Sequence, residues 1–399
     1  MKLSTISEKI PASPIRKLVP YANAAKKKRI KILHLNIGDP DIETPEVMIK
    51  TIQSWNRNPV SYSDSRGEHE LLVSLMRYYE KLGYDHLALE NMQVTFGGSE
   101  GILWSFLATC SPGDEVIVFE PFYANYQSFA VMANVRLVPV STRIEDGFHL
   151  PSKKEIEKRI TKKTKGILVC NPGNPTGTVY TRQELELLLG LAKKHKLFIM
   201  TDEVYREFTY DGQKAISILE YSHEYPEGII MIDSLSKRYS LCGARLGVLV
   251  SHNKDLMETF LKFGQARLSV GLIDQVTAAQ LKYVTKPYFQ KVNKEYKERR
   301  DVLYRELHKI PGVFCLKPEG AFYLIVKLPV KNAEDFAQWM LTDFHDNNET
   351  VMIAPAQGFY LSKGLGTNEV RIAYVINTDK LVRAAQLLSK ALKQYSKLK

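Results

Sequence analysis

Residues 166–202 read GILVCNPGNPTGTVYTRQELELLLGLAKKHKLFIMTD, and this stretch decides the fold. The apolar run Gly166–Cys170 is too short for a helix and predicts a strand buried on both faces. Thr181-Arg-Gln-Glu184 is a capping-box pattern that opens a leucine-rich helix running to about His195. A second apolar run, Leu197–Asp202, follows at once. Strand, helix and strand in this order predict parallel strands joined by a helix.

The same alternation extends in both directions from this stretch. Helical patterns occur at Ser99–Thr109 and Asn253–Gly264. Five more short runs rich in β-branched residues predict strands, at Gln93–Phe96, Glu115–Phe119, Arg136–Val140, Gly228–Asp233 and Leu246–Val250. The predicted fold class is therefore α/β, with a mainly parallel seven-stranded sheet that carries helices on both faces.

The character of the chain changes after Leu272. Two long helices, broken near Pro287, run to about Ile310, and a further helix starts at Asp379. Three strands are predicted between them, at Ala321–Leu328, Val351–Pro355 and Glu369–Tyr374. We therefore expect three parts: an N-terminal segment (1–40) that packs on the smaller domain, a large domain (41–286) and a small α+β domain (287–399).

Composition narrows the class of protein. The 399 residues are 44% hydrophobic and 25% charged, which is typical of a soluble globular protein of about two domains. No apolar stretch is long enough to cross a bilayer, and the N-terminus lacks the apolar core of a signal peptide, so we expect a cytoplasmic protein. The four cysteines make no CxxC pair, which indicates a reducing compartment and no structural zinc, and we expect no metal site: Cys110, Cys170, Cys242 and Cys315.

The chain is basic, with 55 Lys and Arg against 44 Asp and Glu and a formal net charge of +11. The basic residues occur in short runs such as Lys26–Arg29, between helical segments and without a motif that reads nucleic acid. We therefore expect a solvated basic surface and no nucleic-acid partner. Such a surface also suits small anionic substrates.

Four distinctive segments lie at or just beyond the carboxyl ends of predicted strands, where ligands bind in open α/β sheets. Phe96-Gly-Gly-Ser-Glu100 joins a strand to a helix, and its glycines and free N–H groups suit a phosphate. Asn171-Pro-Gly-Asn-Pro-Thr-Gly177 holds Asn171 and Asn174 in defined directions. Asp202-Glu-Val-Tyr205 places an acid at the mouth of an apolar strand, where a carboxylate needs a cation.

The fourth segment is Ser234-Leu-Ser-Lys-Arg-Tyr-Ser-Leu-Cys-Gly-Ala-Arg-Leu-Gly247, between two buried strands. A lysine in a loop is ordinarily a solvated charge, but Lys237 stands among hydroxyls, small residues and Arg245. Partial desolvation and a neighbouring positive charge favour a reactive amine in such a segment. This is how a nucleophilic lysine that forms a Schiff base is made.

Taken in order, the glycine-rich turn, NPGNPTG, DEVY and SLSK…GAR resemble the class I/II aminotransferases, which are pyridoxal 5′-phosphate (PLP) enzymes of fold type I. The resemblance runs from Gly38 in Asn-Ile-Gly-Asp-Pro-Asp to Arg371 in Glu-Val-Arg-Ile-Ala-Tyr, and is closest to the aspartate aminotransferase-like branch. It implies that the large domain binds PLP, that the reaction is ping-pong, and that a homodimer shares its active sites between subunits.

The resemblance also implies roles toward the cofactor. Lys237 forms the Schiff base and later acts as general base, while Asp202 pairs with the pyridine N–H. Tyr205 and Asn174 hydrogen-bond the 3′-oxygen of the ring, and Tyr123 stacks on its face. The residues assigned to the phosphate are Gly98, Ser99, Ser234, Arg245 and, from the neighbouring subunit, Tyr62.

For the substrate, the resemblance implies that Arg371 binds the α-carboxylate, with the Gly38 backbone closing over it and Asn174 also in contact. Two departures from the family pattern concern the pocket wall. Many relatives carry a bulky residue where this chain has Ala244, and Arg267–Gln275 lacks the Asn or Pro of several subgroups. Substrate choice is the property that these departures leave open.

We predict an aminotransferase acting on aspartate or glutamate, with 2-oxoglutarate as acceptor. The side-chain carboxylate of such a substrate needs a cation besides Arg371, and the candidates are Arg16 and Arg267. The alternative is a pocket for alanine or aromatic amino acids, to which four apolar or aromatic residues could contribute: Ile15, Leu18, Tyr21 and Tyr126. A PLP-dependent C–S β-lyase would keep every cofactor residue, so that activity also stays open.

Overall fold

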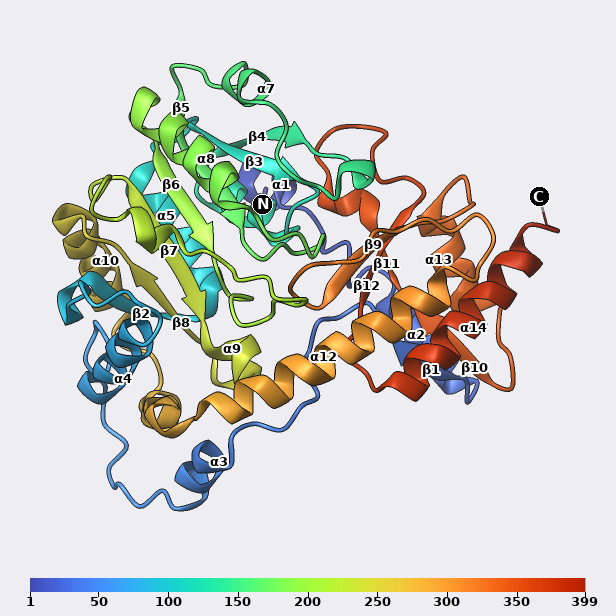
Figure 1. Ribbon diagram of the computed structural model, residues 1–399, viewed down its shortest axis with the longest axis horizontal. Coiled ribbons are helices and arrows are strands. Elements are labelled where there is room, and N and C mark those ends of the chain that lie inside the picture. The colour runs from blue at the N-terminus through green and yellow to red at the C-terminus, as the bar shows by residue number, and fades with distance from the viewer. Residues whose placement is uncertain (399) are drawn as a thin grey trace.

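The computed structural model describes residues 1–398, and at its centre is a seven-stranded sheet (Figure 1). The strand order is β2-β8-β7-β6-β5-β3-β4, and β8 alone runs antiparallel to the others. The strands are β2 (Met92–Phe96), β3 (Glu115–Glu120), β4 (Arg136–Ser141), β5 (Thr164–Cys170), β6 (Phe198–Asp202), β7 (Ile229–Ser234) and β8 (Leu246–Val250). All seven predicted strands are present, with ends within two residues, so the α/β prediction is confirmed.

Helices cover both faces of this sheet because its strands are apolar on both sides. Along β5, Ile167 and Val169 face one layer and Leu168 faces the other. One layer contains α3 (Glu46–Gln53), α4 (His69–Glu80), α7 (Lys153–Glu157), α8 (Arg182–His195) and α11 (Leu272–Ala278). The other contains α5 (Gly97–Thr109), α6 (Asn125–Met132) and α10 (Lys254–Arg267).

A second unit has its own apolar core beside the large sheet (Figure 1). It contains an antiparallel sheet of order β11-β12-β9 and a parallel pair, β1-β10. The strands are β1 (Lys31–His34), β9 (Tyr323–Lys327), β10 (Glu349–Met352), β11 (Ala354–Pro355) and β12 (Glu369–Ala373). Its helices are α2 (Val19–Lys27), α13 (Ala333–Thr342), α14 (Thr378–Tyr395) and the long α12 (Lys286–Leu307), which reaches back to the large sheet. No helix within residues 1–398 is long and apolar enough to span a membrane.

The N-terminal segment divides its contacts between the two units. Helix α2 packs against α13, and β1 pairs with β10 of the smaller unit. Helix α1 (Thr5–Lys9), in contrast, contacts α6 of the large unit. The division into domains at residues 40 and 286 stays a prediction, and Lys399, the last residue of the expected small domain, lies outside the described residues.

Two elements differ from the expectation. Pro287 does not break a helix but occupies the first turn of α12, where a residue without an N–H is tolerated because that group has no helical partner. The expected strand Val351–Pro355 is split into β10 and β11, which pair with different strands. The split strand arises from tertiary pairing, which short sequence windows do not contain.

The strand directions place the chemistry at one edge. Because β2, β5, β6 and β7 run the same way, their carboxyl ends at Phe96, Cys170, Asp202 and Ser234 meet on that edge. Strand β12 of the smaller unit brings Arg371 to the same place.

Candidate active site

A cavity of about 550 Å³ opens at this edge of the sheet. It is lined by eleven of the residues predicted for the site: Gly38, Gly98, Ser99, Tyr123, Asn174, Asp202, Tyr205, Ser234, Lys237, Arg245 and Arg371. The remaining predicted residue, Tyr62, does not line the cavity and is 82% exposed. The chain therefore gathers these side chains in one place, while their individual roles stay predictions.

Lys237 lies on α9 (Leu235–Arg238), a short helix that follows β7 directly. Ser234 caps this helix, since its Oγ accepts a hydrogen bond from the N–H of Ser236 at 3.2 Å. The Nζ of Lys237 donates to the carbonyl oxygen of Gly38 at 2.8 Å and lies 3.7 Å from the Sγ of Cys242. No carboxylate forms an ion pair with this amine in the described chain, so it stays available for chemistry.

Asp202 ends β6 and is buried. The hydroxyl of Tyr126 donates to its carboxylate at 2.6 Å, and the N–H of Val204 lies at 3.5 Å. Burial raises the pKa of Asp202 to about 6. Among residues 1–398 no Lys, Arg or His lies within ion-pair distance, so this carboxylate faces the cavity without a cation.

Two hydroxyls and an amide converge beside Asp202. The Oη of Tyr205 lies 3.0 Å from the Oη of Tyr323, and the Nδ2 of Asn174 donates to Tyr205 at 3.4 Å. Burial raises the pKa of Tyr205 well above its usual range, so the hydroxyl stays protonated. Tyr123 also lines the cavity, and burial raises its pKa to about 12. These groups can donate to an oxygen of a bound ring.

The glycine-rich turn forms the start of α5. Gly97 has a φ of +70°, a conformation that favours glycine, and a Cβ there would lie 2.9 Å from Nη2 of Arg245. The guanidinium of Arg245 is therefore directly against the turn. Gly98 and Ser99 follow in the first turn of α5, where free N–H groups and the helix dipole favour an anion. The hydroxyl of Ser234, nearby in the cavity wall, donates to the carbonyl of Leu246 at 3.0 Å.

Arg371 is a buried cation on β12. Its Nη1 donates to the Oδ1 of Asn174 at 3.1 Å and its Nη2 to the carbonyl of Asn36 at 2.5 Å. Its Nε has no hydrogen-bond acceptor among the described residues, and burial lowers the pKa of the guanidinium from its usual value. The side chain is flanked by aromatic rings, with its Cζ 4.5 Å from the Tyr323 ring centre and 5.1 Å from that of Phe359.

Sequence reasoning missed several lining residues, of which Tyr323 has the most contacts with the predicted set. A Cβ on Gly38 would lie 1.8 Å from the Tyr323 hydroxyl, so only glycine allows this close approach. The only signal for Tyr323 was its place at the start of the predicted strand Ala321–Leu328, where a tyrosine is indistinguishable from a core residue. The other missed residues are Ser13, Ile37, Ile102, Asn125, Val204, Ser236 and Cys242.

The two candidate cations for a second carboxylate differ in their surroundings. Arg16 lines the cavity, is exposed, and its side chain has no ion-pair or hydrogen-bond partner within residues 1–398. Arg267 does not line the cavity; its Nη1 lies 3.1 Å from Glu100, and its guanidinium lies over the rings of Phe96 and Trp104. Ile15 lines the cavity as well, whereas Ala244 does not.

Together, this fold and this set of side chains define an enzyme of the PLP-dependent fold type I class. The model of the family "aminotransferase class I and II" matches residues 30–388, so the chain belongs to that family. The resemblance seen in the sequence is thus confirmed, and the protein is an aminotransferase.

Individual relatives differ in the substrates that their names state. The chain is 31% identical to an aspartate aminotransferase of Thermotoga maritima over 95% of this chain and 96% of that protein. It is 29% identical to an aromatic-amino-acid aminotransferase of Thermococcus litoralis, which covers 99% of both chains. The solved structure of an alanine aminotransferase from Pyrococcus furiosus superposes with a TM-score of 0.89 at 29% identity, covering 98% of this chain and all of that one. The comparisons therefore leave the amino donor open.

Proposed function

We propose that this aminotransferase holds PLP in the 550 Å³ cavity and acts on an acidic amino acid. One observation carries the proposal: a single cavity contains a buried carboxylate without a cation, at Asp202, and a buried guanidinium with an unpaired Nε, at Arg371. Buried charges of this kind are costly unless a ligand pairs with them. A pyridinium N–H and an α-carboxylate supply the two partners.

The donor set fits PLP group by group. Asp202 would accept from the ring N–H, and Tyr205 and Asn174 would donate to the 3′-oxygen. Tyr123 would cover a ring face. Gly98, Ser99, Ser234 and Arg245 would bind the phosphate, because a helix start and a cation meet at the glycine-rich turn. When bound, PLP accepts the electron pair released at the substrate Cα.

The chain's own groups then handle the proton and the substrate. Lys237 is the residue that would attach PLP, and its Nζ would also be placed to take the proton from the substrate Cα. Arg371 would bind the α-carboxylate with two of its guanidinium nitrogens. The hydrogen bonds from Nη1 to Asn174 and from Nη2 to the Asn36 carbonyl fix the plane of the guanidinium. The rings of Tyr323 and Phe359 flank that plane and exclude water from it.

An acidic substrate is favoured by Arg16. It is an unpaired guanidinium on the cavity wall, so a second carboxylate would gain a charge-assisted hydrogen bond there. Arg267 is a weaker choice within the same subunit because Glu100 already pairs with it. Alanine or an aromatic amino acid would instead use the apolar wall formed by Ile15 and Ile37. Aspartate or glutamate, with 2-oxoglutarate as acceptor, is our proposed pair.

We also propose a homodimer that shares its active sites, in the cytoplasm. Exposed apolar side chains near Tyr62 support the dimer: Val60 is 56% exposed, Leu268 52% and Phe96 41%. The segments of Val60 and Leu268 are joined, since the N–H of Ser63 donates to the Oγ of Ser269 at 3.2 Å, and the guanidinium of Arg267 lies over the ring of Phe96. A folded surface rich in such side chains is typical of a protein interface.

The test is a panel of amino acids assayed with 2-oxoglutarate on purified, PLP-loaded protein, together with its visible spectrum. We expect a yellow protein and the highest kcat/KM for aspartate or glutamate. If alanine or tyrosine exceeds both by more than about tenfold, which is ~1.4 kcal/mol in the transition state, the acidic-substrate proposal is wrong. Release of pyruvate and a thiol from a cysteine conjugate would indicate the β-lyase alternative.

A further inference from the structure

We propose that a second cavity, separate from the active site, binds a nucleoside polyphosphate. This cavity has a volume of about 1520 Å³ and shares no lining residue with the first. It lies between the carboxyl half of α4, the start of α12, the residue after α9, and the segment from Arg206 to Glu220. Figure 1 shows α9 beside the start of α12, where the rings of Tyr239 and Tyr288 stack with centres 6.5 Å apart.

The charge of the cavity wall is strongly positive. Seven Lys and Arg residues line it, against two acids, Glu207 and Glu220. Glu220 is paired with Arg182 at 2.7 Å, and Glu207 accepts from the hydroxyl of Tyr78. Four of the cations have no side-chain ion pair or hydrogen bond anywhere in the described chain: Arg77, Lys81, Lys214 and Lys286. Such a concentration of unpaired positive charge favours an anion with several negative charges.

The start of α12 adds to this preference. Thr285 and Lys286 line the cavity, and α12 has neither an acidic residue in its first turn nor a side-chain cap. Pro287 has no N–H and the N–H of Tyr288 donates to the carbonyl of Thr285 at 3.1 Å, so this helix start offers a ligand the N–H of Lys286 and the positive end of the helix dipole. A 22-residue helix with an uncapped N-terminus beside unpaired cations is a suitable place for a phosphate.

A buried donor on the cavity wall also lacks a partner. Arg206 lines the cavity and is 7% exposed, and its Nη2 is engaged with Glu203 at 2.6 Å. Its Nε and Nη1 have no hydrogen-bond acceptor within residues 1–398, and Nη1 lies 3.9 Å from the carboxylate of Asp233. Buried polar atoms of this kind ordinarily have partners, so an acceptor-rich ligand would complete the wall.

The size and the aromatic wall identify the class of polyanion. The cavity exceeds the roughly 300–1,000 Å³ of ordinary small-molecule sites, so inorganic phosphate alone would leave it mostly water-filled. Phe289 is half-buried in the wall and presents apolar surface to a planar ring, and the buried Tyr239 packs against it with ring centres 5.7 Å apart. Phosphates on the cations and a base on the ring of Phe289 are the two parts of a nucleotide.

The first experiment is calorimetry on the PLP-loaded enzyme with ATP in the absence of divalent metal, so that the cofactor phosphate site is filled. We expect binding with a Kd below about 1 mM that weakens as salt is raised from about 50 to about 200 mM. Adenosine should not bind detectably. No heat with ATP, or equal binding of adenosine, would overturn the proposal. Tripolyphosphate binding as tightly as ATP would show that the ligand is inorganic and overturn the nucleotide assignment.

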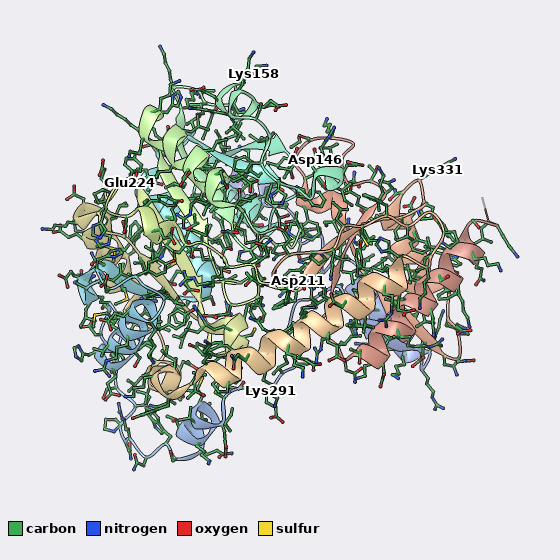
Figure 2. The ribbon with its side chains drawn as sticks, viewed as in Figure 1. Asp146, Lys158, Asp211, Glu224, Lys291 and Lys331 are labelled. Carbon is green, nitrogen blue, oxygen red and sulfur yellow. The ribbon has the colours of Figure 1, made fainter. Side chains whose placement is uncertain are left out.

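The second experiment locates the site. The double variant R77A/K286A removes two exposed, unpaired cations from the wall and should weaken ATP binding by about tenfold. K291A is the matched control, because Lys291 is exposed on the same helix and does not line the cavity (Figure 2). Both variant proteins should keep wild-type transaminase activity, which verifies that they fold. If R77A/K286A does not fold, the double variant K81A/K214A takes its place. Unchanged ATP affinity in the folded double variant would place the ligand elsewhere and refute the proposal.

Discussion

The Nζ of Lys237 donates a hydrogen bond of 2.8 Å to the carbonyl oxygen of Gly38, which lies 199 positions earlier in the chain. Lys237 follows the carboxyl end of β7, whereas Gly38 belongs to the segment after β1, which pairs with the smaller unit. The amine proposed as catalytic base is thus held by the loop proposed to close over the substrate carboxylate. This contact aims the amine into the cavity.

K237A is expected to bind PLP but to lose transamination, because no other amine lines the cavity wall in the described residues to take the Cα proton. The rate should fall by at least about 10²–10⁴-fold, the usual contribution of a positioned base. K163A, on an exposed lysine, is the control. Borohydride reduction followed by peptide mapping should place the cofactor on Lys237, and attachment to another lysine would refute the assignment.

D202N should be nearly inactive with its fold intact, because the amide cannot keep a ring nitrogen protonated. D202E should lose less, since it retains the charge at a displaced position. Steady-state kcat with the best substrate measures the effect. An Asn variant within about tenfold of wild type, or ~1.4 kcal/mol of barrier, would show that the carboxylate has another role.

The same residue predicts a pH effect on the stability of the cofactor-free protein. Burial raises the pKa of Asp202 from 3.8 to about 6, so the folded chain binds a proton that the unfolded chain has released. The free energy of unfolding should therefore fall between about pH 4 and 6, by roughly 3 kcal/mol at most. D202N removes this loss. Urea titrations at pH 4 and pH 8 measure the free energy of unfolding of apo D202N minus that of apo wild type. This difference should be more positive at pH 8 than at pH 4. The opposite trend would contradict the burial argument.

Shared active sites predict complementation between inactive subunits. In a mixture of Tyr62→Phe and Lys237→Ala proteins, each heterodimer has one site with both wild-type residues. Activity should therefore rise above that of either variant alone after subunit exchange. Sedimentation should show a dimer at assay concentration. A monomer there would rule out the proposed contribution of Tyr62 across an interface.

R16A should lower kcat/KM for aspartate by about tenfold and leave that for alanine within about twofold, because only the acidic substrate has a carboxylate for this guanidinium. R267A is the comparison variant: it removes the Glu100 pair and should reduce stability more than substrate discrimination. Equal losses for both amino acids in R16A would indicate that Arg16 acts on the fold of the N-terminal segment instead of on the side chain of the substrate.

The sequence predicted the large sheet well because its strands are buried on both faces and read as short apolar runs, such as Leu246–Val250, which matches β8 at both ends. It predicted which side chains meet at the cavity because Asp202, Asn174 and Lys237 lie at or just beyond the carboxyl ends of strands. It did not separate Tyr323 from the core, since a buried strand residue has the same pattern whether or not it reaches a cavity.

The choice between Arg16 and Arg267 also lay beyond the sequence. It depends on Glu100, which pairs with Arg267 across 167 positions of the chain. Tyr126, considered for the substrate wall, is buried behind the cavity and donates to Asp202, and Leu18 is part of the small unit's core. These assignments rest on tertiary contacts that no local pattern contains.

The reversed direction of β8 has a consequence for the order in which the site assembles. Because β8 returns antiparallel beside β7, one hairpin-like connection, residues 235–245, carries both Lys237 and Arg245. Contacts so near in sequence close a short loop and form quickly, whereas Arg371 and Asn174 must meet from 197 positions apart. During synthesis, moreover, the lysine and its arginine leave the ribosome well before Arg371. In a newly made chain we therefore expect Lys237 and Arg245 to come together before Arg371 reaches Asn174.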